Sequence, residues 1–198
     1  MNLPNLLTIS RLLFPFIVIL TYFLNLNANT QGLIVLFFFI LLSFTDYLDG
    51  VIARKLNLIS NFGKVFDPIS DKVLTSTSLL FILSYEDKLL IPSMLIIARE
   101  FIVSGNREYM LSTKGKSIPV IFLSKLKTTF QFLSITLFLA NNLILNYTNI
   151  SIFNFAYICI WITTILTIYT GIQYSYHTFI SKKKKEINEY FILLMDKR

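Results

Sequence analysis

The sequence has very little cysteine, histidine, glycine or proline. Its 198 residues include one cysteine and one histidine, so no disulfide can form within the chain. We expect Cys159 to be a small buried hydrophobic residue, and His177 to be a polar residue near the end of an apolar run with no catalytic role. The six glycines and five prolines form no linker, and no internal repeat is visible. The chain is therefore expected to carry no separate soluble domain.

Acidic residues are also scarce, whereas long hydrophobic runs dominate the sequence. The chain is 55% hydrophobic and contains eleven aspartates and glutamates. A helix that crosses a bilayer core needs about 20 residues, and six apolar stretches approach or exceed that length. They cover residues 6–24, 32–45, 69–85, 89–110, 128–145 and 150–180, and the second continues as a helix through residue 54. We predict an all-α polytopic membrane protein with about six transmembrane helices, formed by a membrane domain over residues 1–181 and a basic tail over residues 182–198.

The 18 lysines and arginines, which give a net charge of +7, are distributed unevenly. Six spans place the amino terminus, residues 54–64, residues 107–127 and the tail on one side of the membrane. With Lys72 and Arg99 assigned to the nearer helix ends, that side holds seventeen of the eighteen basic residues, and the other side has Lys88. The positive-inside rule predicts that this side, with both termini, is cytoplasmic. Basic residues that border apolar spans do not favour nucleic-acid binding. The KKKK run from Lys182 fits either contact with anionic lipid headgroups or a solvated tail.

Four of the eleven carboxylates lie between residues 46 and 71, at the ends of two hydrophobic segments. Residues three or four apart share a helical face, so Asp46 pairs with Asp49 and Asp67 pairs with Asp71. A short connection through Gly63 would bring the two spans together as antiparallel neighbours. Charges near a bilayer are costly and therefore indicate a functional site. We expect the four carboxylates to converge at the membrane interface.

Converging carboxylates repel one another unless a cation lies among them. Aspartate oxygens with no histidine or cysteine nearby favour Mg²⁺ or Mn²⁺ over zinc, and the spacing leaves open whether one or two ions bind. Gly50 and Ala53 share the carboxylate face, where small residues allow either the approach of a ligand or close helix packing. Arg54 fits either a position among the headgroups or a contact with a phosphate. The pattern indicates a metal site that handles a phosphate-bearing substrate.

The residues in this segment resemble the signature of a known family. The segment contains Asp46-x-x-Asp49-Gly50-x-x-Ala53-Arg54, then eight residues, then Gly63-x-x-x-Asp67-x-x-x-Asp71. This pattern is similar to the CDP-alcohol phosphatidyltransferase motif at all eight fixed positions. The resemblance implies an integral membrane enzyme that transfers a phosphatidyl group from CDP-diacylglycerol to an alcohol and releases CMP. It implies that Asp71 is the general base and also touches a metal held by Asp46, Asp49 and Asp67. It further implies a CDP and diphosphate site that includes Asp49, Gly50, Ala53, Arg54 and Gly63.

A second set of charged residues occurs in ARE at 98–100, NRE at 106–108 and SKLKTTFQ at 124–131. Basic side chains at these helix ends would form an anion pocket, which favours an anionic acceptor. These segments and the opening NLPNLLTISR resemble a branch of the family whose acceptor is sn-glycerol 3-phosphate. That resemblance implies that Asn5, Thr8 and Arg11 lie near the CDP end. It implies that the acceptor phosphate is bound by Arg99, Arg107, Lys125 and Lys127.

Other interpretations of these residues stay open at the level of sequence. Ser124 stands where that branch often has glycine, which weakens the acceptor assignment and leaves the chemistry unaffected. Arg99 with Glu100 also fits an ion pair within the bundle, and Lys125 and Lys127 also fit the positive flank of a span. The same chemistry with another acceptor would make a cardiolipin, phosphatidylserine or phosphatidylinositol phosphate synthase. A metal-ion transporter is a more distant alternative, and a homodimer is implied by family resemblance alone.

Overall fold

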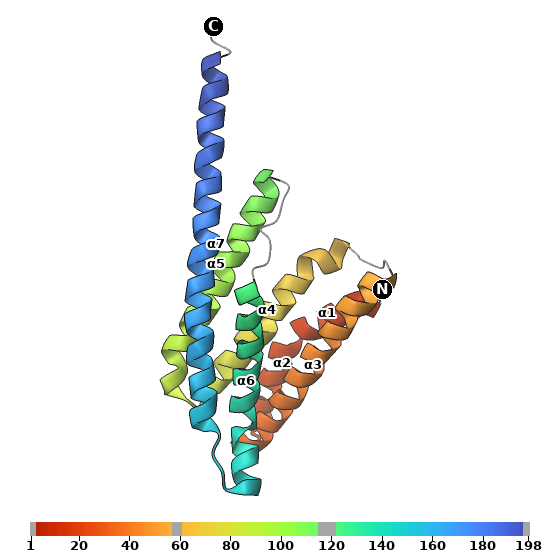
Figure 1. Ribbon diagram of the computed structural model, residues 1–198. Helices are drawn as coiled ribbons and strands as arrows, with labels where there is room; N and C mark the ends of the chain where they lie inside the picture. The colour runs from red at the N-terminus through yellow and green to blue at the C-terminus, as the bar shows by residue number, and fades with distance from the viewer. Residues whose placement is uncertain (1–2, 57–60, 115–121, 196–198) are drawn as a thin grey trace.

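The computed structural model describes the backbone of residues 3–56, 61–114 and 122–195, and the side chains of residues 5–45, 63, 65–113 and 122–179. Within these ranges every regular element is a helix, which confirms the predicted all-α class. The elements are α1 (Leu3–Leu12), α2 (Phe14–Phe23), α3 (Ala28–Leu56), α4 (Asn61–Leu83), the 3₁₀ helix η1 (Asp87–Leu89), α5 (Leu90–Lys114), α6 (Phe122–Thr148) and α7 (Phe153–Met195). They form an elongated bundle beyond which the carboxyl-terminal part of α7 extends (Figure 1).

The first hydrophobic run is divided, whereas the sequence predicts one continuous helix over residues 6–24. Helix α1 ends at Leu12, and α2 begins at Phe14 after Leu13. Pro15 lies in the first turn of α2, where its missing amide and fixed φ angle suit a helix start. The two helices still form one apolar segment, Asn5–Phe23, that is long enough to cross a membrane.

Five segments of the described chain are long and apolar enough to span a bilayer, one fewer than predicted. They are Asn5–Phe23, Ala28–Thr45, Asp87–Thr113, Phe122–Thr148 and Phe153–Phe179. Helix α4 is 23 residues long, but its amino-terminal half carries Asp67, Asp71 and Lys72. These charges interrupt the apolar run, so α4 is better described as a polar-ended helix enclosed by its neighbours than as a simple hydrophobic span.

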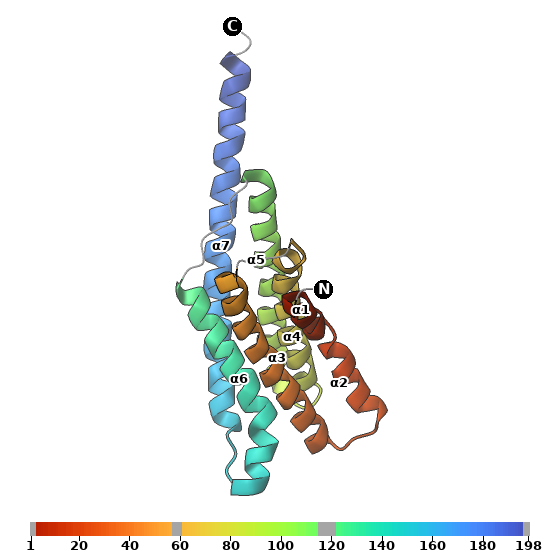
Figure 2. The same cartoon turned by 90° about the vertical axis from the view of Figure 1, so that its right-hand side faces the viewer.

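The helices pack around a main hydrophobic core, with α6 antiparallel to α3 and α7, α1 parallel to α4, and α5 parallel to α7 (Figure 1). Helix α7 lies along α6 and α5, α1 lies against α4, and α3 lies against α6 (Figure 2). The core is formed by large side chains that are almost fully buried, including Phe14, Phe39, Leu79, Ile96 and Ile135. Trp161 packs against this core, and Cys159 is 3% exposed, which confirms the buried position predicted for that cysteine.

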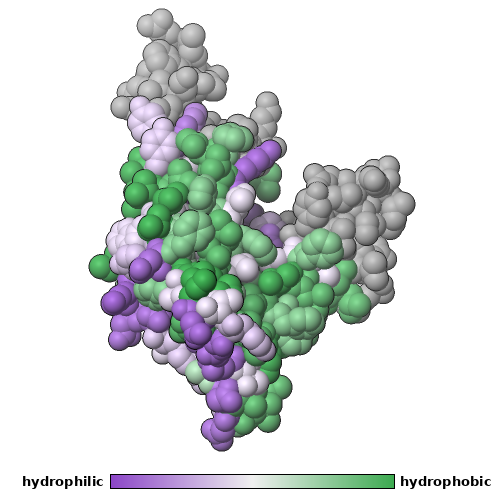
Figure 3. All heavy atoms as spheres, turned by 60° about the horizontal axis from the view of Figure 1, so that its bottom comes forward, coloured by the Kyte–Doolittle hydropathy of each residue, from purple (hydrophilic) through white to green (hydrophobic). Residues whose placement is uncertain are grey.

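The outer surface is strongly apolar along the helices. Phe16, Phe37 and Ile165 are each more than 60% exposed, which is costly in water and expected in contact with lipid. Hydrophobic residues cover much of the face in Figure 3, where the end of the bundle that carries the α6–α7 connection comes forward and hydrophilic residues gather on it. This distribution supports an integral membrane protein.

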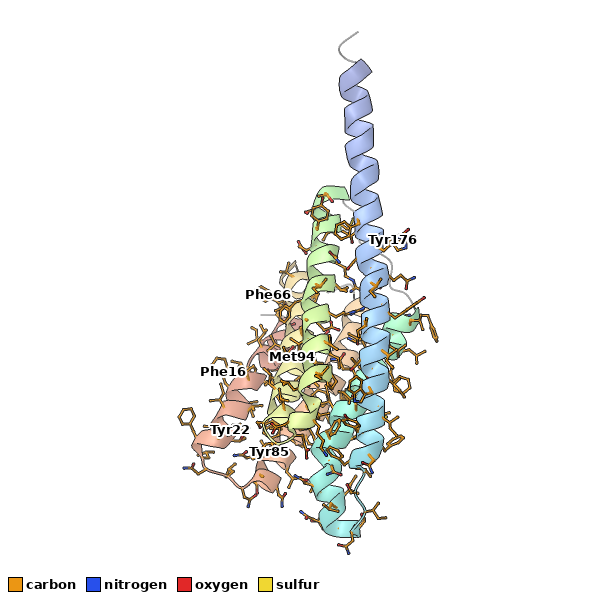
Figure 4. The ribbon with its side chains drawn as sticks, turned by 90° about the vertical axis from the view of Figure 1, so that its left-hand side faces the viewer. Phe16, Tyr22, Phe66, Tyr85, Met94 and Tyr176 are labelled. Atoms are coloured by element: carbon orange, nitrogen blue, oxygen red, sulfur yellow. The ribbon has the colours of Figure 1, made fainter. Side chains whose placement is uncertain are left out.

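The two ends of the bundle differ in the helix termini and the side-chain contacts that lie there. Helices α1, α4 and α6 begin toward the end of the bundle that Figure 1 shows at the top. Helices α3, α5 and α7 end toward it. At the other end Tyr85 donates a hydrogen bond to Gln31, and the hydroxyl groups of Tyr22 and Ser84 lie 2.7 Å apart, which ties α2 and α3 to the end of α4. Figure 4 shows Tyr22 and Tyr85 together at that end, away from Phe66.

Candidate active site

The described carboxylates of the motif lie one turn apart on α4, where α1 packs against it. Arg11 on α1 is 2% exposed, and its guanidinium forms ion pairs with both of them. Its Nη1 donates to Oδ1 of Asp71, and its Nη2 lies 3.4 Å from Oδ1 of Asp67. Thr8, one turn earlier on α1, donates from Oγ1 to the same Oδ1 of Asp67 at 2.6 Å. Thr8 and Arg11 are therefore direct partners of the motif.

This arrangement balances part of the negative charge from inside the protein. The Asp67 and Asp71 side chains are 50% and 53% exposed, whereas the Arg11 side chain behind them is 2% exposed. In each of these contacts the acceptor is Oδ1, and both aspartates line a cavity that Arg11 does not line. The buried guanidinium of Arg11 thus fixes both carboxylates, and the exposed parts of the two aspartates line the cavity.

Several predicted site residues lie outside the described side chains. The backbone of Asp46, Asp49, Gly50, Ala53 and Arg54 belongs to α3, but the structure describes nothing of their side chains. Convergence of all four carboxylates therefore stays a prediction. Among the residues whose side chains are described, no three of the His, Cys, Asp and Glu type come together.

Gly63 was expected in a short connection between the two spans, and that expectation is wrong. It lies in the first turn of α4, which begins at Asn61, and it is buried. The helix starts earlier than the predicted hydrophobic run, because the mixed polar and apolar residues from 61 onward belong to the same helix. Asn5, the remaining predicted residue of the CDP end, lies on α1 one turn before Thr8 and is partly buried.

A cavity of about 390 Å³ joins the aspartates to the basic residues of the second charged set. Helix α4 contributes Asp67 and Asp71, α5 contributes Arg107, and α6 contributes Lys127. An adjoining cavity of about 180 Å³ is lined by a further group of mostly basic and hydroxyl side chains. These residues include Lys72, Arg99, Ser104, Arg107, Ser124 and Lys125. Each of the four predicted acceptor residues therefore lines one or both cavities, next to the carboxylates.

Like Lys72, Glu100 lines both cavities and was not assigned to the pocket by sequence reasoning. Its Oε1 accepts a hydrogen bond from Nζ of Lys127 and lies 3.3 Å from Nη1 of Arg99. The Lys127 side chain is 1% exposed and the Glu100 side chain 17% exposed, so this is a largely buried ion pair. A carboxylate inside an apolar helix is itself a signal of function, and that signal was visible next to Arg99.

The arginines of the pocket are held by α7. Arg99 Nη2 donates to Oγ1 of Thr170 at 2.8 Å, and Arg107 Nη2 donates to the hydroxyl of Tyr174 at 3.2 Å. Within the described residues, Nε of both arginines is buried and makes no hydrogen bond. Both cations are thus fixed by neutral oxygens, and Arg99 has the Glu100 contact in addition.

The donor set suits a hard divalent cation. Asp67 and Asp71 offer carboxylate oxygens toward a cavity large enough for an ion with bound water, and oxygen ligands are those that Mg²⁺ and Mn²⁺ prefer. Arg11 pairs with both carboxylates and does not line the cavity, which suits a supporting partner that orients them. These residues fit the predicted metal.

Comparison with known proteins agrees with the motif. Residues 1–169 match the family described as CDP-alcohol phosphatidyltransferase. The chain is 41% identical to a Rickettsia typhi protein over 174 residues, which is 87% of this chain and 94% of that protein. It is 33% identical to a Bacillus subtilis protein, with 87% of this chain and 93% of that protein covered. A Haemophilus influenzae protein is 36% identical, with coverages of 87% and 91%. All three are named CDP-diacylglycerol–glycerol-3-phosphate 3-phosphatidyltransferase.

Proposed function

The chain belongs to the CDP-alcohol phosphatidyltransferase family, and from this we propose that it transfers the phosphatidyl group of CDP-diacylglycerol to sn-glycerol 3-phosphate. The products are phosphatidylglycerophosphate and CMP, which makes the enzyme part of anionic phospholipid synthesis. The observation that carries the proposal is the cavity in which Asp67 and Asp71 face Arg107 and Lys127. Carboxylates for metal and base chemistry and cations for a phosphate acceptor share one space.

We propose that Mg²⁺ or Mn²⁺ is held by Asp46, Asp49, Asp67 and Asp71. When bound, the metal would neutralise charge on the diphosphate of CDP-diacylglycerol and on the departing CMP. The chain's own part is to orient the carboxylates, which the Arg11 and Thr8 contacts support. The remaining residues proposed for the CDP and diphosphate site are Asn5, Thr8, Gly50, Ala53, Arg54 and Gly63.

Asp71 is the proposed general base. A hydroxyl of glycerol 3-phosphate loses its proton to this carboxylate while its oxygen bonds to the phosphorus of the phosphatidyl group. The bond between that phosphorus and the oxygen bridging to CMP breaks, and CMP leaves with the electron pair. Asp71 lines the cavity and is about half exposed, so a soluble acceptor can reach it. Its contact with Arg11 fixes the direction in which the carboxylate points.

We propose that Arg99, Arg107, Lys125 and Lys127 provide the positive surroundings of the acceptor phosphate. Five cationic side chains and three carboxylates line the two adjoining cavities, so their lining carries net positive charge. Lys127 is already paired with Glu100, so Arg107, which lines both cavities, is the first candidate for direct contact. A neutral acceptor such as serine would gain less from this site than a phosphomonoester does.

The site lies toward the end of the bundle that Figure 1 shows at the top, and we propose that this end faces the cytoplasm. The lipid tails of CDP-diacylglycerol then stay in the bilayer while its polar head and the soluble acceptor meet at the aspartates. In a bacterium the membrane would be the inner membrane. A homodimer is also proposed, on family resemblance alone, and cross-linking in native membranes tests it.

The experiment measures CMP release by purified protein with CDP-diacylglycerol and Mg²⁺. Glycerol 3-phosphate, serine, inositol phosphate and phosphatidylglycerol are added separately, and Asp71→Asn serves as the inactive control. We expect release that requires glycerol 3-phosphate, stops when EDTA removes the metal and returns with Mg²⁺ or Mn²⁺. Release with a different acceptor would overturn the substrate, while no release with any of them from folded protein would overturn the enzyme class.

A further inference from the structure

We propose that Tyr174 on α7, supported by Thr170 and Gly171, is a positioning residue that holds Arg99 and Arg107 for the acceptor phosphate. The inference rests on the proposed function and adds a determinant of acceptor affinity to it. These α7 residues lie beyond residue 169, where the match to the family ends.

Tyr174 lies between the two arginines. It is 0% exposed, and its ring centroid is 5.0 Å from Cζ of Arg107 and 5.8 Å from Cζ of Arg99. Both distances are within the range in which the negative face of an aromatic ring attracts a cation. The Tyr174 hydroxyl also accepts a hydrogen bond from Nη2 of Arg107 at 3.2 Å. One buried side chain thus contacts both guanidinium groups.

The preceding turn of α7 fixes the rest of Arg99. Thr170 Oγ1 accepts from Nη2 of Arg99 at 2.8 Å. A Cβ placed on Gly171 would lie 2.9 Å from Cγ of Arg99, so the arginine stem crosses α7 where there is no side chain. Thr170 and Tyr174 are four residues apart and share one face of the helix. That face is the one that α7 turns toward α5.

The groups that hold Arg99 and Arg107 determine how much of their positive charge remains available to a ligand. Arg99 and Arg107 lie on either side of one tyrosine ring and repel each other as like charges, and a carboxylate between them would hold them together but would also cancel the charge that a phosphate needs. Lys127 shows this second case, because Glu100 neutralises it. An aromatic ring and a hydroxyl group hold Arg107 and leave its full charge available, whereas Arg99 has the ring, the Thr170 hydroxyl and a contact with Glu100, which Lys127 shares. The element therefore preorganises the cations for a dianionic ligand.

A merely structural role is the alternative, in which Tyr174 packs α5 against α7 and nothing more. Tyr176 provides a matched control, because it lies two positions later on α7 but is 65% exposed and points outward (Figure 4). We would compare Tyr174→Phe and Tyr174→Leu with Tyr176→Leu. Each protein would be assayed for the KM of glycerol 3-phosphate, the KM of CDP-diacylglycerol, kcat and thermal unfolding.

We expect Tyr174→Leu to raise the KM of glycerol 3-phosphate by about tenfold, since it removes both the ring and the hydroxyl. Tyr174→Phe keeps the ring and should raise this KM by about threefold. The KM of CDP-diacylglycerol should stay within about twofold in both, and Tyr176→Leu should leave all values unchanged. Equal changes in the two KM values, or an unchanged acceptor KM in Tyr174→Phe, would overturn the positioning role. If Tyr174→Leu does not fold, Tyr174→Phe decides the question.

A binding measurement separates this inference from the proposed function. Calorimetry with purified protein and glycerol 3-phosphate alone should show weaker binding by Tyr174→Phe than by the wild type. If wild-type protein neither binds glycerol 3-phosphate nor releases CMP with it, the proposed acceptor is wrong. Inorganic phosphate is then the probe, and equal phosphate binding by wild type and Tyr174→Phe would overturn the positioning role.

Discussion

At the scale of single residues, the contact between Thr8 and Asp67 ties the first helix to the chemistry. The hydroxyl donates to a carboxylate at 2.6 Å, and hydrogen bonds to charged groups are stronger than those between neutral groups. We expect Thr8→Val, which keeps the shape and removes the donor, to lower kcat/KM for CMP release by about tenfold. Ser10→Ala is the control, since within the described residues Ser10 donates to the backbone of Leu7 and not to the site. Equal rates in the two variants would show that Thr8 does not support the site.

Glu100 makes a prediction about stability. It is the partner of buried Lys127, and removing one member of a buried ion pair leaves the other charge without compensation. Glu100→Gln should lower the free energy of unfolding by about 3 kcal/mol, measured by denaturation in detergent. Replacing both residues, as Glu100→Gln with Lys127→Met, should recover much of that loss. The exposed Glu108 on the same helix provides a control, and Glu108→Gln should leave stability unchanged. Similar losses in Glu100→Gln and Glu108→Gln would contradict the prediction.

Sequence reasoning identified site residues that belong to a local sequence pattern or to a segment that resembles the family. Asp67 and Asp71 are one turn apart, and Thr8 and Arg11 followed from the resemblance of the opening segment. The role of Tyr174 was not predicted, because its contact with Arg107 joins residues 67 positions apart and leaves no local pattern in the sequence. An isolated tyrosine in an apolar helix reads as a packing residue. Only the fold shows that two cations lie beside it.

At the scale of helices, the α5–α7 contact depends on Gly171. An added Cβ there would lie 2.9 Å from Cγ of Arg99, and that flexible side chain would have to move. Gly171→Ala should therefore raise the KM of glycerol 3-phosphate by about threefold and leave the KM of CDP-diacylglycerol unchanged. Gly105→Ala on α5 is the matched control, because no heavy atom lies within 4 Å of its added Cβ. That change should leave kinetics unaltered and stabilise the helix by about 0.5–1 kcal/mol. Identical kinetics in the two variants would contradict the prediction.

The hydrophobic pattern predicted the helices well where apolar residues alone decide them. It located the helices that become α3, α5, α6 and α7, but it did not find the break at Leu13 or the polar first turns of α4. Both misses have local causes. Pro15 starts a new helix inside an apolar run, and the residues from 61 to 67 form helix although polar and charged residues interrupt their apolar ones. Hydropathy reports burial in lipid, whereas helix boundaries depend on backbone hydrogen bonds.

At the scale of the whole molecule, the position of the carboxylates follows from the two substrates. One is a lipid confined to the bilayer and the other is dissolved in water, so the reacting groups must lie where both can reach them. Helix α4 meets this need by combining a charged amino-terminal half with an apolar carboxyl-terminal half. Its neighbours then bring basic residues from α5 and α6 to the same level. The scarcity of acidic residues elsewhere keeps the other spans compatible with lipid.

The orientation of the bundle gives a prediction that does not depend on activity. Ser112 is exposed near the carboxyl end of α5, and Ser151 is exposed in the connection between α6 and α7, at opposite ends of the bundle. In a background with Cys159→Ala, which removes the one native cysteine, each serine would be replaced by cysteine. A membrane-impermeant maleimide should label Ser151→Cys in intact spheroplasts and Ser112→Cys only after the membrane is opened. This result follows from the positive-inside rule, because the end near Ser112 carries the basic residues. The reverse pattern would place the active site on the outer face, and labelling of both from one side would refute the order of spans itself.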